Sequence, residues 1–224
     1  MILEPFTQIY QRACANQGGE QALNSKLCSL KTPNELRAIP SDRWLAEFTR
    51  KVFQCGMVWR VINNKWPGFE AVFWQFDIEK LLMMSDEWWE EKARDKRIVR
   101  CLYKVMTIKA NAQMIYEENL KCGFSEMIAS WPSDDITALW AYLKSHGARL
   151  GGNTGPYALR AMGKDTFFLT RDIEAYLRSH NLITGGLHSK RSLTNAQNAF
   201  LEWQQQSQRP LSHISQIVAW SVGK

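Results

Sequence analysis

Residues 150–159, which read LGGNTGPYAL, form the stretch best suited to holding a ligand. Gly147 is expected to end the helix before this stretch, and Pro156 suits the first turn of the helix after it. A tight hairpin between two helices leaves the first amides of the second helix without partners, and glycines let a phosphate approach them closely. The spacing therefore predicts a helix, a hairpin and a helix that hold a nucleic-acid backbone through Gly152, Thr154 and Gly155.

This hairpin resembles that of the helix-hairpin-helix DNA glycosylase superfamily, in which a loop rich in Gly and Pro leads to an aspartate that opens the next helix. Residues 163–171 supply the loop here, and Asp172 supplies the acid. The resemblance implies an all-α fold with two helical lobes and a cleft between them. We expect a single domain in which residues 1–40 and 165–224 form one lobe, while residues 41–164 form the central lobe that carries the hairpin.

A second resemblance, to the DNA-3-methyladenine glycosylase I family, covers the middle of the chain. Residues 54–59 (QCGMVW) are similar to a QAGLSW-like stretch of that family, and residues 69–77 (FEAVFWQFD) to a stretch with Phe-Asp at its end. The similarity continues at residues 98–100 (IVR) and 111–112 (NA). Together with the hairpin it spans about residues 42–176, and it implies an enzyme that excises an alkylated purine such as 3-methyladenine from double-stranded DNA.

Such an enzyme extrudes a nucleotide, holds its base between aromatic faces and stabilises positive charge on the sugar. The resemblance gives Asp172 the catalytic role of stabilising that charge or orienting water, although the 3-methyladenine glycosylase I branch typically lacks this acid. The alternative is that Asp172 only caps its helix beside Thr170. Pro156 stands where lyase-competent members have a nucleophilic lysine, which implies a monofunctional enzyme that uses water.

For the base pocket, Trp59 matches the tryptophan of the family, and an indole stacks well on a purine. Trp44 and Phe48 are further candidates for the same wall, and Tyr157 completes this aromatic set. The alternative is that aromatic residues at helical spacing belong to the core.

Lys51 stands at the position where the family has a carboxylate in its base pocket, so this chain lacks the acid that would recognise the base. Glu47 lies one helical turn earlier and is a substitute candidate. We favour the other interpretation, in which Glu47 and Lys51 form a surface ion pair at i,i+4 spacing.

Gly56 and Met57 fall where the family fills the gap left by the flipped nucleotide, and an unbranched Met suits a wedge between bases. Met57 equally suits a core position. In a glycine-containing loop further on, Lys190 and Arg191 are candidates for phosphate contacts.

The sequence predicts neither a cofactor nor a metal site. Its C-terminal region has histidines but no cysteine, and the five cysteines of the chain are widely spaced, as expected for free thiols in a reducing compartment. A formal charge of +6 makes an anionic partner plausible. The start of the chain does not resemble a signal peptide, and no apolar run approaches a membrane span. We therefore expect an intracellular monomer, in a bacterial-type cytoplasm or its equivalent, that does not contact membranes.

Helical periodicity dominates the chain, and we expect its strongest helices at residues 43–54, 97–119, 134–145, 195–206 and 211–222. A shorter helix is expected at residues 21–30. Two alternatives to an enzyme remain open. One is a DNA-binding protein that kept the hairpin but lost the pocket, and the other is a helical protein-interaction domain.

Overall fold

The computed structural model describes residues 3–222 and is helical throughout that range, with fourteen α-helices, two short 3-10 helices and no strand among the described residues. It divides into two compact units. Unit 1 comprises the described parts of Met1–Leu30 and Gly163–Lys224 together with Pro132–Ala138, and unit 2 comprises Lys31–Trp131 and Leu139–Met162. Within residues 3–222, no helix combines the length and the apolar character needed to cross a membrane.

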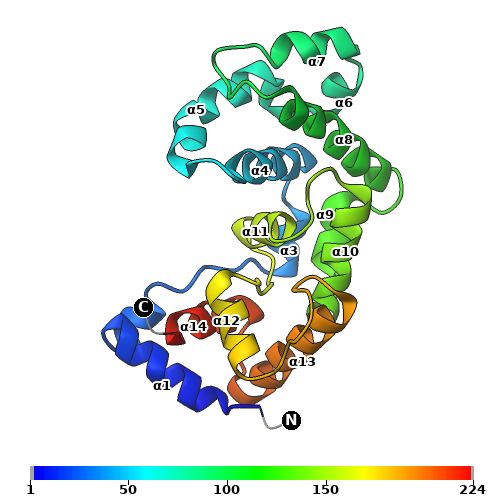
Figure 1. Cartoon of the computed structure of the whole chain (residues 1–224). Helices are drawn as coiled ribbons and strands as arrows, with labels where there is room; N and C mark the ends of the chain where they lie inside the picture. Colours follow the sequence, from blue (N-terminus) through cyan, green and yellow to red (C-terminus); the bar gives the residue numbers. More distant parts are fainter. Residues whose placement is uncertain (1–2, 223–224) are drawn as a thin grey trace. The chain divides into compact units, whose positions relative to one another are not determined.

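Unit 2 holds the hairpin and most of the helices before it (Figure 1). Its elements are α3 (Pro33–Arg37), α4 (Ser41–Gln54), α5 (Trp59–Val72), η1 (Trp74–Phe76), α6 (Ile78–Leu82), α7 (Asp86–Lys92), α8 (Leu102–Asn119), α9 (Phe124–Ser130) and α11 (Thr154–Ala161). The helix α10 (Ile136–His146) has its first residues in unit 1 and the rest in unit 2.

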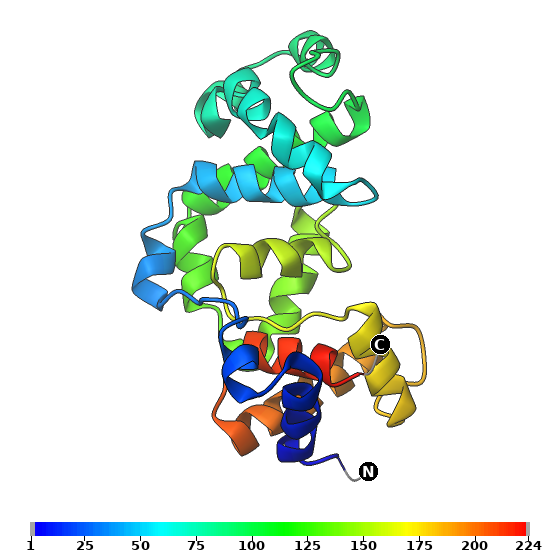
Figure 2. The same cartoon turned by 90° about the vertical axis from the view of Figure 1, so that its left-hand side faces the viewer.

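The centre of unit 2 is α4, which packs on α8 and on α11 (Figures 1 and 2). Its apolar residues recur at helical spacing, so they share one side of the helix, and Trp44, Phe48 and Phe53 are fully buried there. The helix ends at Gln54, and Gly56 follows with a φ of +72°, a conformation that favours glycine. This break separates α4 from α5 and directs the chain into the segment that precedes Trp59.

Unit 1 contains α1 (Phe6–Gln17), α2 (Glu20–Asn24), η2 (Ser133–Asp135), α12 (Arg171–Ser179), α13 (Lys190–Ser207) and α14 (Leu211–Ser221). Its core forms where α14 packs against α1, α12 and α13. The carboxylate of Asp165 accepts hydrogen bonds from the backbone amides of Leu211 (3.0 Å) and Ser212 (2.8 Å). Asp165 therefore caps α14 from outside the helix and anchors the segment that leads to Asp172.

Several predicted helix boundaries are wrong. The helix expected at residues 21–30 is the short α2, and α8 begins at Leu102, not at residue 97. In the five residues before α8, the side chain of Arg97 folds back onto Asp95, with 2.6 Å between Nη2 and Oδ2. The helix expected from residue 195 begins at Lys190, because the side chain of Ser189 accepts a hydrogen bond from the amide of Ser192 (3.2 Å).

Candidate nucleic-acid interface

The hairpin between α10 and α11 is held by a side chain of α8. The amide of Ala148 donates to Oδ1 of Asn111 (2.7 Å), and Nδ2 of Asn111 donates to the carbonyl of Ala148 (3.2 Å). A Cβ at Gly147 would lie 2.6 Å from Leu150 Cδ1 and 2.8 Å from the carbonyl of Leu143, so only glycine fits there. The sequence prediction that Gly147 follows the end of a helix is confirmed, since α10 ends at His146.

The turn itself presents free backbone amides. Within residues 3–222, the amides of Gly151 and Gly152 have no hydrogen-bond partner. Gly152 has a φ of +61°, a conformation that suits glycine. By contrast, the amide of Gly155 donates to the carbonyl of Leu150 (3.0 Å), and Gly155 is buried. The prediction that Gly155 holds phosphate is therefore corrected, because its amide closes the hairpin.

A cavity of about 340 Å³ lies beside this turn. It is lined from the hairpin by residues 151–154 and Tyr157, and from the end of α4 and the start of α5 by Lys51, Gln54, Cys55, Gly56 and Trp59. The structure thus brings together six of the residues predicted for the site, namely Trp59, Lys51, Tyr157, Gly56, Gly152 and Thr154. Gly151, Asn153, Gln54 and Cys55 were not assigned to the site, although all four belong to the two motifs that define it.

Trp59 begins α5 and is 51% exposed, so the alternative that it belongs to the core is wrong. Its ring meets that of Tyr157 edge to face, with 6.2 Å between centroids and 84° between planes. Nζ of Lys51 lies 5.4 Å from the centroid of the same indole, within the range of a cation–π contact. The indole is therefore held by a ring from α11 and a cation from α4 while half of its surface stays open to a ligand.

Lys51 and Glu47 form the predicted ion pair, with 3.0 Å between Nζ and Oε1, but the pair does not lie on the surface. The side chain of Lys51 is 14% exposed and that of Glu47 is 10% exposed. Glu47 also approaches Arg50, whose Nη1 lies 3.6 Å from Oε2. Lys51 further donates to Oε1 of Gln54 (3.3 Å). Glu47 does not line the cavity, so the structure assigns it to holding Lys51, not to meeting a base.

Trp44 and Phe48 do not form the pocket wall. Both are fully buried, neither lines the cavity, and both pack on Phe124 of α9. Nε1 of Trp44 donates to Oγ of Ser125 (2.9 Å), which satisfies its only polar group inside the core. Helical spacing placed these rings on the buried side of α4, and they fill the interior of unit 2.

The segment between α4 and α5 is fixed by a lysine from α8. Nζ of Lys104 donates to the carbonyls of Phe53 (3.1 Å) and Cys55 (2.8 Å), and burial lowers the pKa of this amine below its ordinary value. Met57 is partly exposed and Val58 is 67% exposed. This anchored segment therefore presents apolar side chains outward, and the alternative that Met57 is fully buried core is wrong.

A cation and an aromatic ring missed by the sequence analysis lie near this segment. The guanidinium of Arg149, which follows Gly147 in the hairpin, stacks over the exposed ring of Tyr103, with 4.7 Å between Cζ and the ring centroid. Arg149 also lies close enough to Lys104 to lower the pKa of its amine. The sequence feature that indicates Arg149 as a site residue is its position inside the hairpin, where a cation favours phosphate binding.

The remaining predicted site residues lie in unit 1. Asp172 is exposed in the first turn of α12, and the cap of that helix is Thr170, whose side chain accepts a hydrogen bond from the amide of Ile173 (3.4 Å). The alternative that Asp172 is the cap is therefore wrong. Lys190 and Arg191 are exposed, but they occupy the first turn of α13 instead of the predicted loop.

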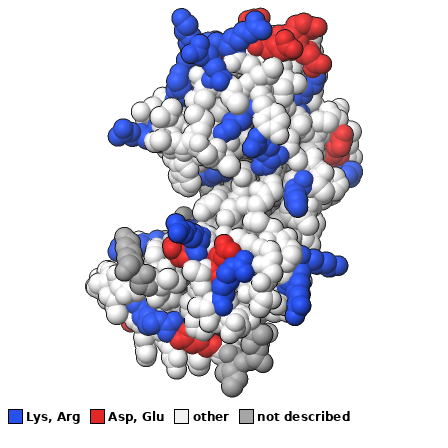
Figure 3. Space-filling view, in the orientation of Figure 1, with Lys and Arg blue, Asp and Glu red and all other residues white. Residues whose placement is uncertain are grey.

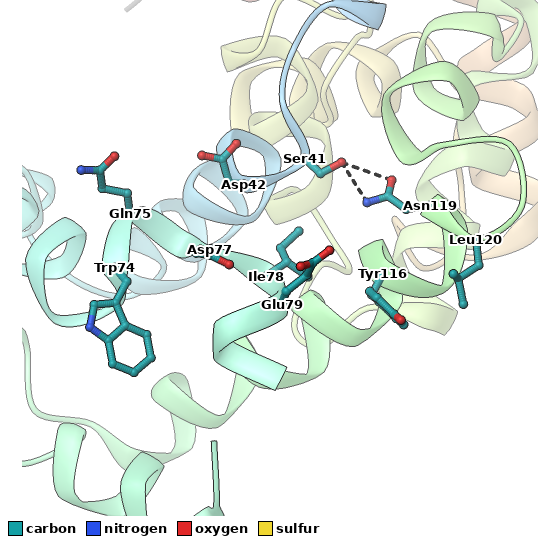
Figure 4. A pocket seen from close by; sticks show the side chains of 10 residues that line it. All are labelled: Ser41, Asp42, Trp74, Gln75, Asp77, Ile78, Glu79, Tyr116, Asn119 and Leu120. Carbon is teal, nitrogen blue, oxygen red and sulfur yellow. Dashed lines mark hydrogen bonds between the residues drawn. The ribbon is translucent and has the colours of Figure 1, made fainter. Parts of the chain in front are cut away.

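A second cavity in unit 2, of about 590 Å³, has a different character (Figure 4). Its lining includes the carboxylates of Asp42, Asp77 and Glu79, and none of its ten lining residues is Lys or Arg. On the face of unit 2 in Figure 3, acidic side chains gather mainly at the upper right, over α7, and Lys and Arg are spread more widely. Because carboxylates repel phosphates, the cavity beside Trp59 is the better candidate for DNA.

The fold of the chain is similar to that of solved 3-methyladenine DNA glycosylase I structures. It superimposes on a tyrosine-to-phenylalanine variant of 3-methyladenine DNA glycosylase I in complex with 3-methyladenine, with a TM-score of 0.51 and 19% identity over 64% of this chain and 84% of that one. A glutamate-to-glutamine variant of the Staphylococcus aureus enzyme gives a TM-score of 0.51 and 20% identity over the same shares. Comparison with curated proteins gives no significant match.

The chain belongs to the methyladenine glycosylase family, whose model matches residues 41–159. Members of this family are DNA glycosylases. The matched segment begins with α4 and runs through the hairpin into α11, so it contains every residue that lines the cavity beside Trp59.

Proposed function

We propose that this protein is a monofunctional DNA N-glycosylase that excises an alkylated purine of the 3-methyladenine type. The observation that carries the proposal is the cavity in which a half-exposed indole, Trp59, adjoins the free amides of Gly151 and Gly152. A single extruded nucleotide needs both features at once, an aromatic face for its base and backbone donors for a neighbouring phosphate. Membership of the methyladenine glycosylase family supports the same function.

In this proposal, duplex DNA containing the damaged base is bound by the hairpin, and Met57 fills the gap left in the base stack. The base enters the cavity and stacks on Trp59 beside Tyr157. The bond between the base and C1′ of the sugar breaks, the base leaves with the bonding electrons, and water attacks C1′. Pro156 offers no amine for a covalent intermediate, so water is the nucleophile.

Asp172 is proposed to support the positive charge that develops on the sugar, or to orient the attacking water. It lies in the first turn of α12, at the positive end of that helix. Lys190 and Arg191, exposed at the start of α13, are proposed to contact phosphates. The proposed setting is intracellular, where damaged DNA is available.

The test is release of methylated bases from alkylated duplex DNA, with products identified by mass, for the native chain and for Asp172→Asn. We expect the native chain to release a methylated purine and Asp172→Asn to lose at least about 100-fold in rate. Binding to the duplex should be kept in the variant and should weaken as salt rises, because phosphate contacts release counterions.

If both proteins bind the duplex and neither releases a base, the result would instead support a non-catalytic DNA-binding protein. This alternative is favoured by Lys51, a cation at the position of the family's pocket carboxylate. Absent or salt-insensitive duplex binding would point to a protein-interaction domain.

A further inference from the structure

Tyr103 and Arg149 form an exposed pair next to the cavity beside Trp59. The guanidinium of Arg149 lies over the ring of Tyr103, with 4.7 Å between Cζ and the ring centroid, and Tyr103 is 66% exposed. The next residue of α8, Lys104, donates to the carbonyl of Cys55 (2.8 Å). The start of α8 therefore adjoins both the hairpin and the segment that links α4 to α5, and Tyr103 stands there without lining the cavity.

The pair is held in place but has no partner of its own. Arg149 has a φ of +60°, which is uncommon for a residue other than glycine, and both hydrogen bonds of Asn111 hold Ala148, the residue before it. Apart from the contact between the two, neither side chain has a hydrogen-bond or ion-pair partner within residues 3–222. The N–H groups of the guanidinium and the open face of the phenol ring are thus free to meet a ligand.

The segments around the pair are cationic and partly apolar. Residues 55–61, 98–106 and 147–157 contain no Asp or Glu. Their cations are Arg60, Arg100, Lys104 and Arg149. Five of the nine large apolar side chains that are exposed within residues 3–222 belong to the same segments, namely Val58, Trp59, Val61, Leu102 and Tyr103. A surface that attracts phosphates and also offers aromatic faces fits a nucleic acid with an unpaired base.

The other parts of the proposed site are already assigned to the damaged strand. The damaged base occupies the cavity beside Trp59, and Met57 fills the gap that this base leaves. The free amides of Gly151 and Gly152 face a neighbouring phosphate. Extrusion of the nucleotide also leaves the base opposite it without a pairing partner. That base is free to meet a ring outside the duplex, and Tyr103 is the exposed ring that the cavity does not use.

We propose that Tyr103 stacks on the base opposite the extruded nucleotide, and that Arg149 holds the ring of Tyr103 in position for this contact. The inference rests on the proposed glycosylase function, because it requires that a nucleotide be extruded from a duplex. Stacking on an aromatic ring tolerates every base, since each base has a π face. The pair therefore favours duplex DNA over a single strand, whatever the base opposite the lesion.

The experiment measures the affinity of the full chain for two duplexes that carry a tetrahydrofuran abasic-site analogue at the position of the lesion. One duplex has adenine opposite the analogue, and the other has a second analogue there. Neither contains a damaged base, so the result does not depend on catalysis. We expect the native chain to bind the duplex with the opposite adenine at least about five-fold more tightly, because stacking of one base on an aromatic ring contributes about 5- to 150-fold.

The variants test whether this preference comes from the ring of Tyr103. Tyr103→Ala should bring the ratio of the two affinities close to one, whereas Tyr103→Phe, which keeps the ring, should retain the native ratio. Arg149→Met should lower the ratio, because it removes the cation that holds the ring. Tyr116→Ala is the matched control and should keep the native ratio, since Tyr116 is an exposed tyrosine of the same helix that lines the acidic cavity.

Equal binding of both duplexes by the native chain, or a preference that survives in Tyr103→Ala, would overturn the inference. A preference that Tyr116→Ala also loses would overturn it as well. Base release from alkylated duplex DNA is measured separately, so the glycosylase function can stand when the stacking contact fails. Absence of binding to either duplex by the native chain would remove both. Each ratio compares two ligands of the same protein preparation, so an unfolded fraction cancels if a variant is unstable.

Discussion

Replacing Trp59 with alanine should separate the function of this indole from the stability of the fold. Truncating a fully buried Trp or Phe costs about 3–5 kcal/mol of the free energy of unfolding. Trp59 is 51% exposed, so we expect Trp59→Ala to cost about half of that, roughly 1.5–2.5 kcal/mol. Loss of one base stacking on an aromatic ring costs about 1–3 kcal/mol, which corresponds to about a 5- to 150-fold loss in rate or affinity.

Trp44→Ala is the matched control, because Trp44 is fully buried and its indole donates to Ser125. It should cost the full 3–5 kcal/mol or so of unfolding free energy. Any fraction that remains folded should still release bases at the native rate. The assays are chemical denaturation followed by circular dichroism, and single-turnover base release per folded molecule. If Trp59→Ala destabilises as much as Trp44→Ala, or releases bases at the native rate, the assignment of Trp59 to the pocket is refuted.

Two further substitutions test the hairpin and the acid stability of unit 1. Gly155→Ala would place a Cβ 2.6 Å from the carbonyl oxygen of Leu150. We therefore expect this variant to bind duplex DNA at least about ten-fold more weakly in a salt titration, while it keeps most of its helix content. Gly186→Ala is the control and should bind DNA normally, because a Cβ at Gly186 would meet nothing within 4 Å. Hydrogen bonding to Arg12 lowers the pKa of Glu4 to about 2. Because the folded-state pKa lies below the unfolded value of about 4.5, the contribution of Glu4 to stability is present above pH 4.5 and is lost as the pH falls toward 2. Glu4→Gln should therefore flatten the fall in Tm over that pH interval, and an unchanged slope would contradict the assignment.

The hairpin and its position between two helices could be predicted from the sequence because local chemistry determines them. Gly147 must avoid Leu150 and the carbonyl of Leu143, and Pro156 is tolerated in the first turn of α11. These constraints act within a few residues of the chain. The similarity to a known family indicated Trp59 as a residue of the base pocket, and the structure places Trp59 in the cavity beside the hairpin.

The burial of the α4 side chains could not be predicted so well. Helical spacing identifies one apolar side of the helix, but it does not say which neighbour covers each turn. Trp44 and Phe48 face α9 and lie in the core, whereas Lys51, one turn further on, reaches the cavity. The same limit explains why the ion pair between Glu47 and Lys51 was expected on the surface, since the contact of Lys51 with Trp59 depends on a segment outside α4.

The helix α8 sets the spacing between the two walls of the cavity. Lys104 holds the carbonyl of Cys55 on one wall, and Asn111 holds Ala148 at the base of the hairpin on the other. The two side chains are one heptad apart, so they project from nearly the same side of a rigid rod and are separated by about 10 Å along its axis. A single residue inserted between them would rotate one anchor by about 100° relative to the other. The residues between Lys104 and Asn111 should therefore tolerate substitution but not insertion or deletion. The number of residues between these two anchors in α8 fixes the distance between the two walls of the cavity.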